Sequence, residues 1–318
     1  MNIINDIKIA RQRIAPYIVQ TPLIRLPSLD SFLGCRTFIK AENMQITGAF
    51  KIRGAMNKAV SLSPQERAAG LVCASSGNHG KALAYTAKLL GTKAAVVIPY
   101  SAPEIKVKAI EALGAEVIRS DLSERFAVAE RICAERHATL VPPFNDPYVI
   151  AGQGPAGLEI AEQEPELDAV LVPVSGGGLL GGVSCALKNM LPGIKVYGAE
   201  PEALPRYSRS LHAGQITRVP QQRSLADALL SQEPGSLCFP LVQQYVDEVF
   251  PVSDEYLLKA MKLLLTEGKI LAEPSSCIGI AAVLQGLLTV RPEEKVCFLV
   301  SGGSVGLSQL DQLKDVTL

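Results

Sequence analysis

The 318-residue sequence has no excess of either charge, because lysine plus arginine and aspartate plus glutamate both number 31. A chain without a basic excess lacks the electrostatic footprint of a nucleic-acid-binding protein, and no acidic tail indicates disorder. Tryptophan is absent and aromatic residues make up only 5% of the chain, a composition that suits the aliphatic interior of parallel sheets. We therefore expect a folded protein that does not bind nucleic acid.

The seven cysteines, at positions 35, 73, 133, 185, 238, 277 and 297, form no CxxC pair. An odd number of scattered cysteines predicts reduced thiols in a cytoplasmic protein, not a disulfide framework or a zinc site. The start of the chain, MNIINDIKIARQRIAPYI, is charged and amphipathic and does not resemble a signal peptide. The charge-free stretch 169–187 is broken by a proline and five glycines, so we expect no membrane span.

Short apolar runs alternate with longer amphipathic segments along most of the chain. The runs that read as strands are 71–74, 94–99, 115–120, 169–174, 195–200 and 295–301. This alternation predicts parallel βαβ units, and therefore an α/β fold with open, mostly parallel twisted sheets flanked by helices. We expect two domains: a small mobile domain over 69–147, and a large domain formed by 1–68 plus 148–318.

Three of the predicted strands end in a turn of serine and glycine: ASSGNHG (74–80), VSGGGLLGG (174–182) and VSGGS (300–304). Ligands of α/β sheets bind outside the carboxyl ends of the strands, so three such turns predict one converging site. Consecutive amides at the start of a helix bind an anion, and glycine lets the backbone approach the ligand. A single such turn would indicate no function, because glycine commonly follows the end of a strand.

The middle turn allows a second interpretation. Gly176, Gly178 and Gly181 satisfy GxGxxG between a strand and a helix, and Glu200 follows about twenty residues later, where a ribose-binding acid would lie. An NAD-dependent dehydrogenase is therefore an alternative. The same glycines would equally cradle a single phosphate monoester.

The stretch TGAFKIRGA (47–55) places Lys51 among small and apolar residues at the start of a predicted helix. By itself this lysine is typical of a helix start whose stem covers apolar surface while the ammonium stays in water. A functional role depends on the motifs elsewhere in the chain.

TGAFKIRGA, SSGNHG, SGGGLLGG, LAEPSS (271–276) and LVSGGS (299–304) occur in an order and spacing that resembles fold-type II pyridoxal-phosphate (PLP) enzymes. The sequence is most similar to the threonine/serine dehydratase and serine racemase group. The resemblance covers essentially the whole chain and implies a tryptophan synthase β-like architecture, pyridoxal 5'-phosphate as cofactor, an amino-acid substrate and a homodimer.

The resemblance also implies a role for individual residues. Lys51 binds the cofactor covalently and serves as catalytic base, and Ser76 is the second catalytic residue, on the opposite face of the cofactor. The residues implied in cofactor binding are Phe50, Lys51, Asn78, Ser175, Gly176, Gly177, Gly178, Leu179, Glu273 and Ser301. Those implied in substrate binding are Ser75, Ser76, Asn78, His79 and, beside the pocket, Ser236.

The implied reaction is β-elimination from L-threonine, L-serine or a related β-hydroxy amino acid, giving a 2-oxo acid and ammonia. A neutral partner for the ring nitrogen, Ser301, favours this elimination. Serine racemase and β-hydroxyaspartate or phenylserine dehydratase remain alternatives, because dehydratases and racemases share the serine at position 76. A non-catalytic PLP-binding protein that kept the scaffold is a further one.

In relatives with a divalent cation, a glutamate, a carbonyl four residues on and an acid two further bind Mg²⁺ or Ca²⁺. These positions fall on Glu200, Leu204 and Arg206, and an arginine is a poor neighbour for a cation. Glu200 is thus the one candidate metal ligand. Our hypothesis is that Arg206 replaces the charge of the metal by pairing with Glu200; the alternative is that both are ordinary surface charges.

Overall fold

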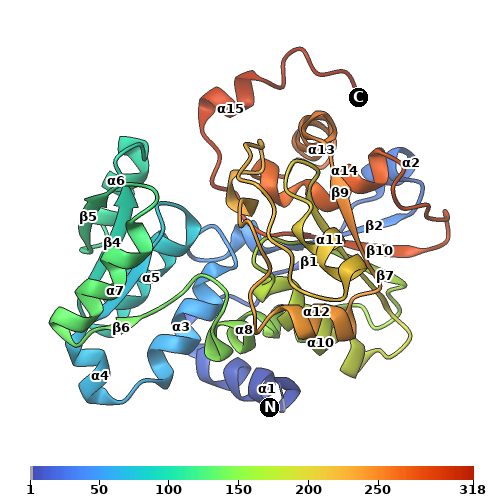
Figure 1. Ribbon diagram of the computed structural model, residues 1–318. Helices are drawn as coiled ribbons and strands as arrows, with labels where there is room; N and C mark the ends of the chain where they lie inside the picture. Colours follow the sequence, from blue (N-terminus) through green and yellow to red (C-terminus); the bar gives the residue numbers. More distant parts are fainter. Residues whose placement is uncertain (1–2) are drawn as a thin grey trace.

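A computed structural model describes residues 3–318 and holds two sheets, which lie apart in Figure 1. Within these residues the larger sheet has the order β1-β2-β10-β7-β8-β9 and the smaller one the order β5-β4-β3-β6. All neighbouring strands are parallel except β1 and β2. The strands are β1 Leu23–Arg25, β2 Arg36–Ala41, β3 Leu71–Ala74, β4 Ala94–Pro99, β5 Glu116–Ser120, β6 Thr139–Leu140, β7 Ala169–Pro173, β8 Lys195–Pro201, β9 Glu248–Val252 and β10 Lys295–Val300.

Helices cover both sheets and connect their strands. The α-helices are α1 Ile3–Ile14, α2 Asp30–Leu33, α3 Lys51–Ser61, α4 Pro64–Ala69, α5 Asn78–Leu90, α6 Glu104–Glu111, α7 Arg125–Arg136, α8 Pro147–Gln153, α9 Pro155–Gln163, α10 Gly178–Met190, α11 Arg206–Ala213, α12 Phe239–Tyr245, α13 Asp254–Thr266, α14 Ile278–Leu284 and α15 Leu307–Asp311. Short 3₁₀ turns are η1 Ala15–Tyr17, η2 Pro27–Leu29, η3 Glu42–Met44, η4 Asp227–Leu229 and η5 Pro274–Ser276. None of the helices within residues 3–318 is long and apolar enough to cross a membrane.

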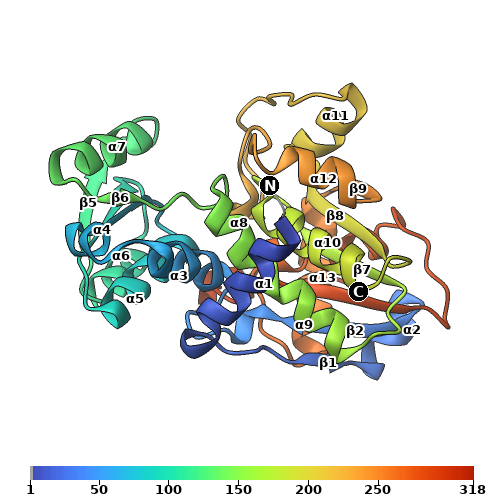
Figure 2. The same cartoon turned by 90° about the horizontal axis from the view of Figure 1, so that it is seen from below.

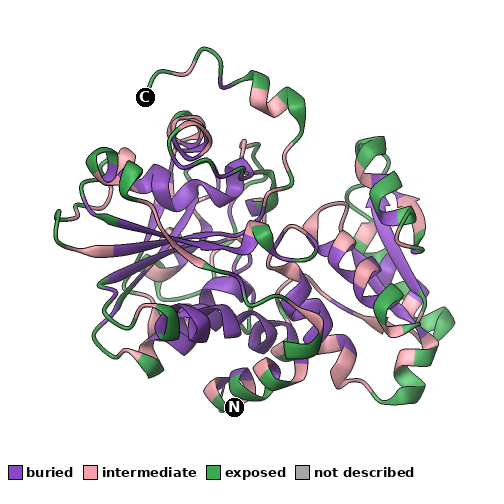
Figure 3. Cartoon of the chain, turned by 180° about the vertical axis from the view of Figure 1, so that it is seen from behind, coloured by how far each residue is buried: buried purple, intermediate pink, exposed green. Residues whose placement is uncertain are grey.

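Both faces of the larger sheet are buried. Along β7, Val170 and Val172 pack with α9, α10 and α12, whereas Leu171, on the opposite face, packs with α13 and α14. The purple strands between two helical layers in Figure 3 show this arrangement. Successive side chains of a strand point to opposite faces, so a strand covered on both sides is apolar throughout. This explains the continuous apolar run at 169–174.

The smaller sheet is built in the same way. Cys73 and Val96 face α5 and α6, and Val72 and Val97 face α7. The six predicted strands and the α/β class with mostly parallel sheets are confirmed, with strand ends shifted by at most one residue. The strands β3 to β6 all lie between residues 71 and 140, whereas the domain boundaries at 69 and 147 stay a prediction.

Two helices, α3 and α8, lie side by side between the sheets (Figure 2). A Cβ atom on Gly152 would lie 2.8 Å from the Arg53 carbonyl oxygen, so the backbones approach more closely than a larger residue would allow. The side-chain amide of Asn57 donates to the Tyr148 carbonyl at 2.7 Å. The helix that begins at Lys51 is therefore packed tightly against its neighbour.

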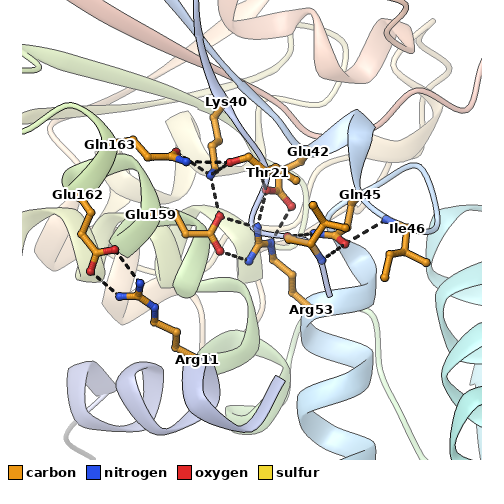
Figure 4. Close-up of polar contacts among 11 residues, drawn as sticks. Arg11, Thr21, Lys40, Glu42, Gln45, Ile46, Arg53, Glu159, Glu162 and Gln163 are labelled. Atoms are coloured by element: carbon orange, nitrogen blue, oxygen red, sulfur yellow. Dashed lines mark hydrogen bonds and ion pairs between the residues drawn. The ribbon is translucent and has the colours of Figure 1, made fainter. Parts of the chain in front are cut away.

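Four buried charges join α3 to the larger sheet (Figure 4). Arg53 donates to both carboxylate oxygens of Glu42 and of Glu159, at 2.7 to 2.8 Å. Lys40 donates to Glu159 at 2.7 Å and to the Thr21 carbonyl at 2.7 Å. We call Lys40, Glu42, Arg53 and Glu159 the buried quartet; their side chains are at most 4% exposed.

The quartet is balanced, with two cations and two anions. Burial alone would raise the pKa of Glu42, but the charge and hydrogen bonds of Arg53 lower it below its usual value. Burial lowers the pKa of Lys40, and Glu159 opposes that shift. Because every partner is needed to offset the loss of water, the quartet fixes how β2, η3, α3 and α9 meet.

Removing one anion should destabilise the protein strongly. In Glu159→Gln, the buried Arg53 and Lys40 keep only Glu42 as a charged partner, and we expect the free energy of unfolding to fall by about 3–5 kcal/mol. Urea unfolding followed by circular dichroism, at saturating cofactor, measures the change.

The matched control is Glu162→Gln on the same helix. Its partner Arg11 and Glu162 are both 38% exposed, so the control should lose at most about 1 kcal/mol. Equal losses in the two variants would contradict the importance of the quartet.

Candidate active site

Lys51 is the first residue of α3 and follows a segment that pairs with the end of β10. Ala49 and Gly302 form an antiparallel bridge, and the Phe50 amide donates to the Ser301 carbonyl at 3.0 Å. These contacts join the TGAFKIRGA motif to the LVSGGS motif. Phe50, Lys51 and Ser301, which the sequence placed in one site, therefore lie together.

The amine of Lys51 is bonded to a neutral acceptor. Its Nζ donates to the Pro143 carbonyl at 2.8 Å and lies 4.9 Å from the centre of the Phe50 ring. Burial of the amine lowers the pKa of Lys51 to about 8. The nearby Cys238 and the charge of Glu273 oppose this shift only in part. A lysine with this pKa is partly neutral near physiological pH and can act as a nucleophile or base.

The glycine turn after β7 lies next to the segment that holds this amine. A Cβ atom on Gly176 would lie 2.3 Å from the ring of Phe144, the residue after Pro143. At Gly177, φ is +99° and a Cβ atom would lie 1.8 Å from the Tyr207 hydroxyl. Only glycine fits these two positions.

The amides of this turn are available to a ligand. Within residues 3–318, no protein acceptor bonds the N–H groups of Gly176, Gly177, Gly178 or Leu179. The Gly176 carbonyl, in contrast, accepts from the Tyr207 hydroxyl at 3.0 Å. The turn also precedes the 13-residue helix α10, so free amides and a helix start combine into an anion site of phosphate size.

Asn78, Glu273 and Ser304 form a polar cluster between the two sheets. The Asn78 side-chain amide donates to both oxygens of Glu273, at 2.9 and 3.1 Å, and the Ser304 hydroxyl donates to the Asn78 carbonyl oxygen at 2.6 Å. Burial raises the pKa of Glu273 to about 7, and the Asn78 bond opposes the shift. Asn78 is the first residue of α5, so this cluster ties the start of α5 to the large sheet.

Ser301 lies at the end of β10 and is buried. Its hydroxyl is 2.9 Å from the hydroxyl of Ser276, which also accepts from the Gly302 amide at 2.7 Å. The LAEPSS and LVSGGS motifs are thereby joined. The partner of the Ser301 hydroxyl, the hydroxyl of Ser276, carries no charge.

The predicted substrate-binding residues gather where β3 leads into α5. Ser75 and Ser76 are partly buried in the turn, and the Gly77 amide donates to the Ser75 hydroxyl at 3.3 Å. The His79 side chain is buried at the start of α5. Its Nε2 lies 2.8 Å from the Val141 carbonyl, and burial, helped by the charge of Lys51, lowers the pKa of His79 to about 3. Its Nδ1 is buried and has no hydrogen-bond partner among residues 3–318.

Ser175 and Ser236 lie beside the phosphate-sized turn but are held by other groups. The Ser175 hydroxyl is 3.1 Å from that of Ser231. Ser236 is exposed and its hydroxyl accepts from the Asn145 amide at 3.1 Å. The amide of Gly235, its neighbour, donates to the Gly176 carbonyl at 2.9 Å. Ser236 is therefore at the rim of the site.

Residues 14–302 match the family described as pyridoxal-phosphate dependent enzyme. The chain belongs to this family. It is 41% identical to the L-threonine ammonia-lyase of Thermotoga maritima over 98% of this chain and 77% of that protein. It is 38% identical to the L-threo-3-hydroxyaspartate ammonia-lyase of Saccharomyces cerevisiae, over 96% and 94% respectively. The structure of maize serine racemase superposes with a TM-score of 0.93, at 40% identity, covering 97% of this chain and 95% of that one. The chain is thus a fold-type II PLP-dependent enzyme.

The residues of the site fit pyridoxal phosphate. The turn after β7 has free amides that would accept a phosphate, and two of its glycines are required by contacts with Phe144 and Tyr207. The amine of Lys51 has a lowered pKa and lies within the same group of residues. These three features match the phosphate and the aldehyde of the cofactor.

The dinucleotide interpretation of GxGxxG is wrong. Glu200, the residue expected to bind a ribose, is fully buried and its two oxygens accept from the amides of Tyr207 and Ser208 at 2.9 and 2.8 Å. No carboxylate oxygen of Glu200 is directed to a ligand beside the turn. The family to which the chain belongs uses pyridoxal phosphate, which carries a single phosphate monoester in place of a dinucleotide.

The residues at the expected cation position do not fit a divalent metal. Glu200 is committed to backbone amides, and the Leu204 carbonyl accepts from Arg206 at 2.8 Å. Arg206 and Glu200 are both 0% exposed, with Nε and Oε2 3.8 Å apart. The alternative that these are surface charges is therefore wrong, and we derive no chemical step through a cation.

Several residues of the site were missed from the sequence. Pro143 and Phe144, between β6 and α8, contact the lysine amine and the glycine turn, and Tyr207 lies against Gly177. No signal in the sequence indicates these three residues, which only the tertiary structure brings to the site. Cys238, which also lies against Gly177, belongs to the PGSLCF segment whose Ser236 was expected beside the pocket.

The lowered pKa of Lys51 makes a testable prediction. Only the neutral amine attacks the aldehyde of the cofactor, so the rate at which the apoprotein captures PLP should rise up to about pH 8 and then level off. A lysine with an ordinary pKa of about 10.4 would show a rate that still rises beyond pH 9. Stopped-flow recording of the visible absorption band expected for PLP bound covalently to the protein measures the rate. Lys51→Ala serves as the blank. A rate that keeps rising about tenfold per unit between pH 8 and 10 would disprove the shift.

Proposed function

We propose that this enzyme eliminates water from a β-hydroxy amino acid, L-threonine or L-serine in the first place, and that hydrolysis of the resulting enamine gives a 2-oxo acid and ammonia. The observation that carries the proposal is that a low-pKa lysine and a turn with free amides lie at the carboxyl edge of the large sheet, where Asn78 at the start of α5 bonds Glu273. The similarity to the threonine ammonia-lyase of Thermotoga maritima supports the choice of substrate class.

The cofactor would be held by residues from both halves of the large sheet and from α5. The amides of residues 175–179 would bind its phosphate, Phe50 would pack on the ring, and Ser301 would face the ring nitrogen. Asn78 and Glu273 would lie at the ring edge, where they already bond each other. When bound, PLP supplies an electron sink for charge that develops at the α-carbon of the substrate. The neutral hydroxyl of Ser301 supports elimination, since it offers the ring nitrogen no fixed negative charge.

The substrate carboxylate would bind at the start of α5. Ser75, Ser76 and Asn78 surround this start, and the amide of His79 adds a donor. A 13-residue helix presents several N–H groups and a partial positive charge at its first turn. This orientation would turn the α-carbon toward the amine of Lys51.

Lys51 would take the α-proton at Nζ. A pKa of about 8 leaves part of the amine neutral and ready to accept a proton. The Pro143 carbonyl, which accepts from Nζ at 2.8 Å, would keep the amine oriented while it is protonated. A catalytic base held by a neutral carbonyl retains its low pKa, because no carboxylate bonds the ammonium and the charge of Glu273 offsets the effect of burial only in part.

Serine racemisation is the second candidate. Ser76 would supply a proton from the face opposite Lys51, and the likeness to maize serine racemase favours this activity. The two activities would share the first proton removal and differ in the next step, which is loss of the β-hydroxyl or return of a proton. Hydroxyaspartate is a third substrate to test, because of the yeast relative.

A substrate panel tests the proposal. We expect 2-oxo acid formation from L-threonine and L-serine in a coupled ketoacid assay, with β-hydroxyaspartate and phenylserine in the same series. Lys51→Ala should lose the visible covalent band and at least about 10³-fold in kcat, because the base and the attachment point are both removed. Chiral chromatography of the L-serine reaction reports racemisation.

Ser76→Ala separates the two activities. It should abolish D-serine formation while keeping at least part of the L-serine elimination, since only racemisation needs a proton from the second face. The control is Ser308→Ala, an exposed serine in α15, which should leave both activities unchanged. A covalent band that survives in Lys51→Ala would refute the assignment of the lysine. Bound PLP without turnover of any of the four substrates would indicate the non-catalytic alternative.

We also propose a homodimer in the cytoplasm. An apolar patch surrounds the 43–46 turn, where the Gln45 side chain bonds both backbone groups of Val19 and Asn43 bonds the Leu271 carbonyl. The patch consists of Val19, Met44, Ile46 and Leu271, each exposed by 42% to 49%. Four large apolar side chains in one patch suit contact with a second copy. All seven cysteines are free thiols, which supports a reducing compartment.

Light scattering tests the dimer. We expect twice the mass of one chain for the wild type and a shift toward the monomer for Met44→Lys/Ile46→Lys. Phe32→Lys, at a residue 47% exposed on α2, is the matched control and should keep the dimer. A monomeric wild type, or a dimer unaffected by the two lysines, would contradict the proposed interface. Disulfide bonds found in protein from freshly lysed cells would contradict the cytoplasmic location.

A further inference from the structure

Arg206 is a fully buried arginine that the reaction does not use. It is the first residue of α11, is 0% exposed and ranks among the largest buried side chains within residues 3–318. An arginine is almost never buried without partners, because a guanidinium out of water needs acceptors for its N–H groups. The position of those acceptors shows what the side chain does.

Three backbone carbonyls surround the guanidinium. Nε donates to the Ser175 carbonyl at 3.1 Å, Nη1 to the Leu204 carbonyl at 2.8 Å, and Nη2 to the Val174 carbonyl. Glu200 adds a carboxylate oxygen 3.8 Å from Nε. Carbonyl and carboxylate oxygens are the ligands that a hard divalent cation takes in proteins. In this protein the guanidinium of Arg206, a cation that is part of the chain, lies within such a set of oxygens.

The same contacts set the direction of the phosphate-sized turn. The carbonyls of Val174 and Ser175 face Arg206, and the carbonyl of Gly176 faces the Tyr207 hydroxyl. Three successive carbonyls thus face the start of α11. The amides that follow them, of Gly177, Gly178 and Leu179, keep no protein acceptor in the described part of the chain. Holding the carbonyls on one side leaves these amides directed to the other.

Glu200, the anionic partner of Arg206, binds the first turn of α11. Its carboxylate accepts from the Tyr207 and Ser208 amides at 2.9 and 2.8 Å and from the Ser208 hydroxyl at 2.6 Å. The end of β8 is thereby fixed to the first turn of α11, and Arg206 fixes that turn to the end of β7. The unit spans the two strands that border the turn.

We propose that Arg206 is a built-in cation that occupies the place of a bound divalent metal and positions the amides of residues 176–179 for the phosphate of the cofactor. Arg206 is a positioning residue, since it acts through the carbonyls of Val174 and Ser175. The proposal rests on the proposed phosphate-binding role of this turn. It makes the enzyme independent of Mg²⁺ and Ca²⁺.

The first experiment compares two cofactor forms. Fluorescence titration of the apoprotein with PLP and with pyridoxal, which lacks the phosphate, gives two Kd values. For Arg206→Gln we expect the Kd of PLP to rise about tenfold or more, the scale of losing bonds to a charged group, and the Kd of pyridoxal to change less than twofold. Equal weakening for both ligands would indicate a general structural effect and would overturn the positioning role. Arg209→Gln, an exposed arginine on the same helix, is the control and should change neither Kd.

The second experiment tests the replacement of a metal. The melting temperature of the wild-type apoprotein should be the same in EDTA, in Mg²⁺ and in Ca²⁺. Arg206→Asp replaces the cation with an oxygen ligand, and its lowered melting temperature should rise again with Ca²⁺ or Mg²⁺, whereas that of Arg206→Gln should not respond. A wild type destabilised by EDTA, or a folded Arg206→Asp indifferent to both metals, would overturn the inference. If Arg206→Asp does not fold, the wild-type response to EDTA and the two cofactor titrations still decide. None of these measurements uses turnover, so an inactive enzyme would contradict the proposed reaction and leave this inference standing.

Discussion

The position of Lys51, the proposed attachment point of the cofactor, depends on the buried quartet. Arg53, two residues after Lys51, holds both Glu42 and Glu159 in bidentate contact, and Lys40 shares the second of these carboxylates. A neutral set of four charges tolerates no missing member at low dielectric, so the arrangement is either complete or strongly destabilised. The first turn of α3 is therefore fixed to the end of β2. That rigidity matters because Lys51 would have to keep its amine at one place while it gains and loses a proton.

A second buried ion pair plays the same part under the glycine turn. Arg206 donates to backbone carbonyls just after β7, and Glu200, in β8, accepts from backbone amides in the first turn of α11, whereas the quartet uses mostly side chains. The two devices meet at one edge of the large sheet, because parallel strands bring their carboxyl ends together. Between them, the amine of Lys51 is bonded only by a neutral carbonyl. The two sets of buried charges thus hold the backbone around the site. The amine of Lys51 keeps its lowered pKa because none of these charged side chains bonds it.

The sequence predicts the strands that end in glycine turns, but it does not predict the residues that pack around those turns. The runs at 71–74 and 169–174 are apolar on both faces, so their strands, and the glycine turns after them, follow directly from composition and length. β2 was missed since it carries Arg36, Thr37 and Lys40 in only six residues, and the burial of Lys40 depends on Glu159, far away in the chain. Pro143 and Phe144 were missed for a related reason. Their role comes from the meeting of the β6–α8 connection with α3, a tertiary contact that no local pattern encodes.

Similarity of about 40% to both ammonia-lyases and a serine racemase has a physical basis in this architecture. The groups that would hold the cofactor and take the first proton come from strand ends and helix starts that the buried ions keep in place. A change of outcome after that proton is removed needs only a different supply of protons, or a different contact with the substrate side chain. Those contacts would come from Ser76 and from rim positions such as Ser236, which lie in turns and bear none of the buried charges. A difference in these contacts would therefore suffice to change the outcome, and the substrate panel, more than the fold, distinguishes the proposed activities.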